Sequence, residues 1–124
     1  MTGGVTRVRL PAEDVAAQAR ARGATVGVAE YTGDRKALLV AFGRALRFPA
    51  WYGRNLDALH DSLTDLSWLP PGEVVLVWIG EQAMRRVDPR GHRAVLDTLA
   101  SAVEAAASGQ RPLTVVLTEP APAP

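Results

Sequence analysis

An unbroken apolar run near the middle of the chain restricts the fold more than any other feature. Residues 73–79 read Glu-Val-Val-Leu-Val-Trp-Ile, and the rigid, turn-forming residues Pro70, Pro71 and Gly72 precede them. A strand without polar alternation is buried on both faces, as a central strand is in a parallel sheet covered by helices. The run therefore predicts an α/β protein with Trp78 in its core.

The other elements follow from hydrophobic periodicity and from capping residues. Strands are predicted over 25–31 and 113–117, and helices over 11–22, 35–47, 56–66 and 89–107. Asp34 and Asn55 are suitable N-caps, because their side-chain oxygens can accept from free N–H groups of the first turn. Residues 80–88 are predicted to form a loop, with at most a helical turn over 82–85.

The alternation of strands and helices predicts the topology. Strands separated by helical crossovers pair in parallel, so we predict a three-stranded parallel sheet packed with helices, plus an extra N-terminal helix. Val5 to Leu10 is predicted to be a short strand or an extended arm. The helix after it has mainly Val15 and alanines as apolar residues, so we expect it at the edge of the core. We expect one domain over 1–118, with a core over about 25–118, an N-terminal arm and helix over 5–23, and a flexible Pro/Ala tail over 119–124.

Composition and charge exclude several classes of function. The 124 residues include 14 basic and 13 acidic ones, so a net charge of +1 gives no argument for a nucleic-acid or membrane-surface partner. Without cysteine, neither a disulfide framework nor a thiolate metal site can form. No signal peptide or membrane span is recognisable. We therefore expect a soluble, cytoplasmic protein.

The helix over 56–66 has two distinct faces. At about 100° per residue, one stripe is apolar and a second, roughly 140° away, is acidic. The apolar stripe is Leu56, Leu59, Leu63 and Leu66, and the acidic stripe is Asp57, Asp61 and Asp65. Acidic residues on an outer helix face are commonly only solvated, and Asp57 in the first turn also suits the helix dipole. Because Trp51 and Tyr52 stand in the preceding Gly/Pro-containing loop, the pattern favours a recognition surface.

The sequence gives little support for catalysis. Asp57, His60 and Asp61 lie three and four residues apart and could share a helix face, so a metal-dependent enzyme is one alternative. Against it, the chain has no HExxH-type pair, nucleophile elbow or phosphate-binding glycine loop. His92 is expected to face solvent, Trp68 to cover the core at a helix end, and the arginines at 85, 86, 90 and 93 to be solvated. We predict a protein that is not an enzyme and holds no cofactor or metal.

The loop and the acidic helix also resemble a known family. Phe48-Pro49-x-Trp51-Tyr52-Gly53-x-Asn55-Leu56-Asp57-Ala58-Leu59-x-Asp61-x-Leu63 is similar to the signature of the barstar family, intracellular inhibitors of barnase-type ribonucleases. A weaker resemblance extends from about Thr25 to Leu117. It implies the barstar fold and a ribonuclease as protein partner.

The resemblance also implies which residues bind. In barstar-like inhibitors the aspartates matching Asp57 and Asp61 contact the nuclease, as does the aromatic residue matching Trp51. The predicted partner-binding residues are Trp51, Tyr52, Gly53, Arg54, Asn55, Asp57, His60 and Asp61. His60 replaces a family tryptophan, and either Ser101 or Glu104 stands for a family glutamate on a later helix. Because the founding inhibitor is acidic and this chain is not, a module that binds a different protein remains the alternative.

Overall fold

The computed structural model describes residues 4–120, and its elements alternate between strands and helices. In chain order they are β1 (Gly4–Arg7), α1 (Ala12–Ala21), β2 (Thr25–Glu30), α2 (Arg35–Ala45), α3 (Leu56–Asp65), β3 (Val74–Ile79), α4 (Glu81–Val87), α5 (Pro89–Ala106) and β4 (Leu113–Thr118). The predicted α/β class is confirmed. Residues 80–88, expected to form a loop, contain the seven-residue helix α4.

The strands form one parallel sheet of four strands in the order β1-β4-β3-β2. The apolar run forms β3, which lies between β2 and β4, and Trp78 has no exposed surface. The prediction of three strands is therefore wrong by one. The additional strand, β1, pairs with β4 from Gly4 opposite Thr114 to Arg7 opposite Leu117. β1 overlaps the segment from Val5 to Leu10, which was predicted as a short strand or an extended arm but was not counted in the sheet.

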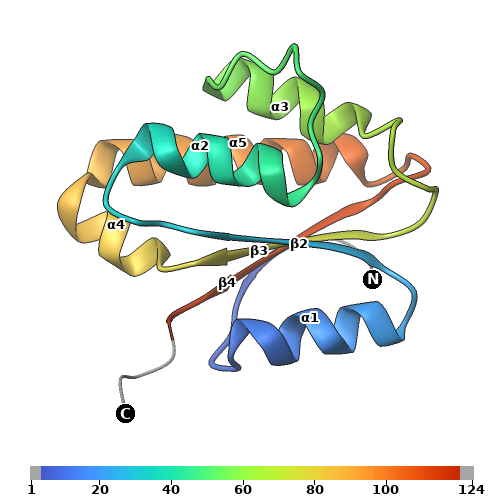
Figure 1. Ribbon diagram of the computed structural model, residues 1–124, viewed down its shortest axis with the longest axis horizontal. Coiled ribbons are helices and arrows are strands. Elements are labelled where there is room, and N and C mark those ends of the chain that lie inside the picture. The colour runs from blue at the N-terminus through green and yellow to red at the C-terminus, as the bar shows by residue number, and fades with distance from the viewer. Residues whose placement is uncertain (1–3, 121–124) are drawn as a thin grey trace.

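Helices cover both faces of the sheet (Figure 1). α1 lies on one face, while α2, α4 and α5 lie on the other and α3 lies outermost, over α2 and α5. Val15 and Ala19 of α1 belong to a second, smaller cluster with Val75 and Val77 of β3, outside the main core cluster. Small side chains let this helix lie close to its face of the sheet.

Capping residues fix where α2 and α3 begin and end. Ala37 N–H donates to Asp34 over 3.0 Å, and Ala58 N–H donates to Asn55 over 2.8 Å, so both predicted N-caps are confirmed. α2 ends because Arg47 adopts a left-handed conformation with φ 57°, and Phe48 N–H then donates back to the Gly43 carbonyl over 2.8 Å. This is the Schellman motif, with arginine where glycine is usual.

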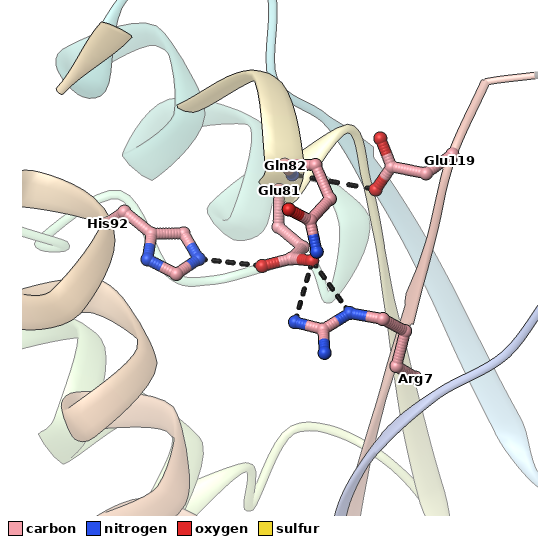
Figure 2. A network of polar contacts seen from close by, with 5 residues as sticks. All are labelled: Arg7, Glu81, Gln82, His92 and Glu119. Carbon is pink, nitrogen blue, oxygen red and sulfur yellow. Dashed lines mark hydrogen bonds and ion pairs between the residues drawn. The ribbon is translucent and has the colours of Figure 1, made fainter. Parts of the chain in front are cut away.

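His92 lies in the interior, contrary to the prediction that it faces solvent. It is 7% exposed, and its Nε2 lies 2.6 Å from Oε1 of Glu81, which has no exposed surface. Nε and Nη2 of Arg7 donate to the other carboxylate oxygen over 3.0 and 2.9 Å (Figure 2). Arg7, Glu81 and His92 thus form one network around the buried Glu81 carboxylate. Its members come from β1, α4 and α5, so no spacing along the chain indicates it.

The two ends of the chain are described in part. The last residues of the predicted tail, 121–124, lie outside the described range, as do residues 1–3. Within residues 4–120, no helix combines the length and apolar character needed to cross a membrane.

Candidate protein-interaction face

The two faces of α3 have opposite environments. Leu59, Leu63 and Leu66 are at most 1% exposed and belong to the core cluster. The three aspartates of the second stripe, Asp57, Asp61 and Asp65, are exposed. We call these aspartates the acidic face. Since the helix is anchored through its leucines, its backbone holds the carboxylates on a rigid support.

The carboxylates of the acidic face have few partners inside the protein. The Asp61 side chain is 80% exposed, and the His60 ring lies beside it, with Nδ1 4.0 Å from Asp61 Oδ1. Within residues 4–120, neither Asp57 nor Asp61 forms an ion pair with an arginine or lysine. Ion pairing with arginine or lysine within the described residues therefore does not occupy these charges.

His60 links the acidic face to α5. Its ring Nε2 lies 3.2 Å from Ser101 Oγ, and the side chain is 35% exposed. Ser101 and Glu104 are both exposed on α5, three residues apart on neighbouring turns. Ser101 is therefore part of the surface next to the aspartates, because it contacts His60 directly.

The loop over 48–55, which we call the aromatic loop, presents Trp51 to solvent. This side chain is 65% exposed and meets the Trp68 ring edge-on, with 6.3 Å between centroids. Trp68 is held in turn by a hydrogen bond from its Nε1 to the Leu46 carbonyl over 2.9 Å and by an edge contact with Phe48. Trp68 therefore covers the core, as predicted, and also supports Trp51 from below.

Tyr52 docks the aromatic loop on α2. Its hydroxyl donates to the Leu39 carbonyl over 3.1 Å, and its ring lies against Gly43, where an added Cβ would be 3.0 Å from two ring carbons. Burial raises the pKa of Tyr52 to about 12, although the positive charge of Arg54 opposes the rise. A glycine on α2 and a tyrosine in the loop therefore form one packed joint, which the sequence spacing did not indicate.

The strained position next to the start of α3 is Arg54, which has a positive φ of 56°. Asn55 caps α3 and also donates from Nδ2 to the Gly53 carbonyl over 3.5 Å. An added Cβ at Gly53 would lie 3.1 Å from that Nδ2, so a small residue suits close packing here.

The structure offers no metal centre at the acidic face. Among residues 4–120, no three His, Asp or Glu side chains lie close enough to hold one ion. Asp57, His60 and Asp61 share one region of α3 without converging on a point. What the arrangement can do is present negative charge and an exposed aromatic ring to another molecule.

These features define a small α/β protein whose distinctive surface is an acidic helix beside an aromatic loop. A model of the family described as Barstar (barnase inhibitor) matches residues 27–118, which is most of the chain. The chain therefore belongs to the Barstar family, as the resemblance indicated. A comparison with curated proteins finds no match. The family's description names an inhibitor of a ribonuclease, and that description applies to barstar itself.

Proposed function

We propose that this protein inhibits a microbial ribonuclease in the cytoplasm by blocking the cationic active site of that enzyme. The observation that carries the proposal is the exposure of Asp57 and Asp61 on a rigid helix, where neither pairs with an arginine or lysine among residues 4–120. A ribonuclease must bind RNA phosphates, so its active site holds positive charge. Carboxylates held one helical turn apart can occupy the positions of two such anions.

Physical chemistry favours strong binding at such a site. Charge-assisted hydrogen bonds between carboxylates and arginine or lysine are short and about twice as strong as neutral ones. A rigid helix loses little conformational freedom on binding, so less of the interaction free energy is lost to ordering. Asp61, near the middle of α3, is proposed as the main phosphate mimic and Asp57 as the second contact.

The aromatic loop supplies the apolar part of the proposed interface. Trp51 offers a large, exposed ring, and aromatic anchors of this kind dominate many protein interfaces. Tyr52, Gly53, Arg54 and Asn55 hold the loop against α2 and α3 and form the rest of the proposed contact surface. His60, between the aspartates, is proposed to contact the partner where other family members carry tryptophan.

The proposal is tested by measuring inhibition of RNA cleavage with purified protein. The enzymes are a guanyl-specific microbial ribonuclease and any ribonuclease encoded beside this chain's gene. Asp61→Ala should weaken inhibition by about 30-fold or more, because truncating one member of a buried charged pair costs about 2–5 kcal/mol. That range comes from measured protein interfaces, the barstar family's among them, rather than from this structure.

A matched control separates binding from folding. Asp14 is an exposed helical aspartate on α1, across the sheet from α3, and Asp14→Ala should inhibit like the wild type. Both variants should unfold at the same urea concentration as the wild type. Equal inhibition by Asp61→Ala and the wild type would contradict the proposed mechanism.

A second candidate function is binding to a protein that is not a ribonuclease through the same face. The near-neutral charge of +1 favours it, since a strongly cationic enzyme would be attracted less than by an acidic inhibitor. Capture from cell extract with the wild type and with Asp61→Ala distinguishes the two. A non-nuclease partner that is captured by the wild type and lost with the variant favours the second candidate.

A further inference from the structure

A pocket lined by arginines adjoins the aromatic loop, on the side of α2. It measures about 250 Å³, and its lining includes Gly43, Arg44, Arg47, Phe48, Tyr52 and Arg54. We call it the arginine pocket. Three arginines thus line one concavity, and none of them has an ion-pair partner among residues 4–120.

Two separate segments build the arginine pocket. Arg44 and Arg47 come from the end of α2, whereas Arg54 comes from the aromatic loop just before α3. The ring of Tyr52, seated against Gly43, joins the two segments and forms part of the wall. The pocket therefore exists only because the loop docks on α2.

Helix electrostatics explain part of this arrangement. Cationic side chains near the end of a helix are favoured by its dipole, which accounts for Arg44 and Arg47. Arg54 lies outside α2, and its backbone has φ 56°. This conformation is unfavourable for L residues other than asparagine and aspartate. Arg54 lines the same pocket as Tyr52. Folding alone therefore does not explain why an arginine stands at position 54.

The arginine pocket is continuous with the acidic face. Arg54 also lines a shallow groove that includes Asn55 and Asp57 at the start of α3. A protein that covers Asp57 must therefore pass close to Arg54. One surface presents carboxylates from α3 and guanidinium groups from α2 and the loop.

We infer that the arginine pocket receives an aspartate or glutamate side chain of the ribonuclease whose cationic site binds the acidic face. The inference rests on the proposed function and adds the chemistry of the partner. Guanidinium groups bind carboxylates in a planar, two-bonded geometry, which suits a pocket with more than one arginine. A partner that is cationic over its whole interface would be repelled there. The arginine pocket therefore restricts the target to nucleases with an acidic side chain beside the active site.

The experiment compares charge reversals at two places. The double variant Arg47→Glu with Arg54→Glu should weaken inhibition of the target ribonuclease by about tenfold or more. The matched control, Arg85→Glu with Arg86→Glu, reverses two exposed arginines on α4 and should change inhibition by less than about twofold. Lysine is then placed at each acidic surface position of the ribonuclease in turn. One such enzyme should be inhibited better by the pocket variant than by the wild type.

The outcomes separate the inference from the proposed function. If Asp61→Ala loses inhibition while the pocket variant inhibits like the wild type, the inference is wrong and the proposed function stands. If the wild type inhibits no ribonuclease, the proposed function fails, and a titration with a hexaglutamate peptide decides whether the pocket takes carboxylates.

That titration monitors the side-chain Nε–H resonances of Arg47 and Arg54 by NMR. Shifts that saturate with the peptide and are absent with inorganic phosphate support a carboxylate site. Shifts that appear with phosphate alone contradict it, and so does the absence of shifts with both probes.

Discussion

Glu81 and Asp61 are both helical carboxylates, but the protein treats them in opposite ways. Glu81 has no exposed surface and is bound by His92 on one oxygen and by Arg7 on the other (Figure 2). Asp61 is 80% exposed, and in the part of the chain that the structure describes its one ion-pair contact is with His60 at 4.0 Å. A buried charge without partners would destabilise the fold, whereas an exposed charge needs none.

This difference indicates which carboxylates are available to bind another molecule. The charge of Glu81 is committed to joining β1, α4 and α5, so changing it alters folding. The charges of Asp57 and Asp61 contribute little to folding, so they can be used for recognition at no cost to the fold. Substitutions in the two regions should therefore affect different measurements.

The largest expected effect is on stability, from His92→Ala. Removing the imidazole leaves Glu81 buried with one partner, and breaking such a pair should lower the free energy of unfolding by about 3 kcal/mol. Urea denaturation at neutral pH measures this change. Asp61→Ala, its exposed counterpart, should change the same quantity by less than about 0.5 kcal/mol. Equal losses in the two variants would remove the distinction between the regions.

The next effect is on binding, from Asp57→Ala. Loss of the second proposed ionic contact should raise the inhibition constant by about 10- to 100-fold. The free energy of unfolding should fall by no more than about 0.5 kcal/mol, which is the helix-dipole contribution of a first-turn aspartate. Inhibition assays and urea denaturation on the same preparation test both statements. A large loss of stability with unchanged inhibition would assign Asp57 to folding instead.

A smaller effect concerns the joint that supports the aromatic loop. Because burial raises the pKa of Tyr52 from 10.0 to about 12, the neutral hydroxyl is favoured in the folded state. The resulting stabilisation is fully present below pH 10 and is lost as the pH rises towards 12. It amounts to about 1 kcal/mol once partial exposure to water is allowed for.

Tyrosinate absorbance during an alkaline titration should show one tyrosine that ionises near pH 12, and Tyr52→Phe should remove that transition. If the transition that Tyr52→Phe removes lies near pH 10 while the protein is still folded, the joint is looser than the structure shows.

The smallest effect is expected at the start of α5. The hydrogen bond from Arg35, supported by the Gly91 N–H and by the charge of Arg35, lowers the pKa of Asp88 below its usual 3.8. A lowered pKa gives stabilisation that is present above pH 3.8 and is lost as the pH falls through the folded-state value.

The stability difference between the wild type and Asp88→Asn should therefore be constant from pH 7 to 5 and shrink below pH 4. A difference that grows towards low pH would contradict the assigned direction. Asp61→Asn is the exposed comparison for this acid titration.

The parts of the structure that depend on local sequence were predictable. The apolar run of β3, the N-caps Asp34 and Asn55 and the two faces of α3 each follow from residues within a few positions of one another. The pairing of β1 with β4 was not predictable, because Val5 meets Val115 across nearly the whole chain. His92 was placed in solvent because the polarity of its side chain was visible and its partner Glu81 was not.

The candidate site shows the same division. The exposure of Asp57 and Asp61 follows from the helical period and the leucines that anchor α3. The seat of Tyr52 on Gly43 and the convergence of Arg44, Arg47 and Arg54 depend on how the loop folds back on α2. Neither of these two arrangements follows from a regular spacing of residues along the chain.

The ion pair between half-exposed Arg7 and buried Glu81 has a practical consequence for anyone shortening this protein. The family match starts at residue 27, inside β2, yet β1 and its residue Arg7, which binds Glu81, precede that position in the chain. A gene fragment trimmed to residues 27–118 would lack Arg7, α1 and the first two residues of β2, and would expose the backbone edge of β4 to neighbouring molecules. Such a fragment should precipitate on expression, although it contains every residue of the acidic face.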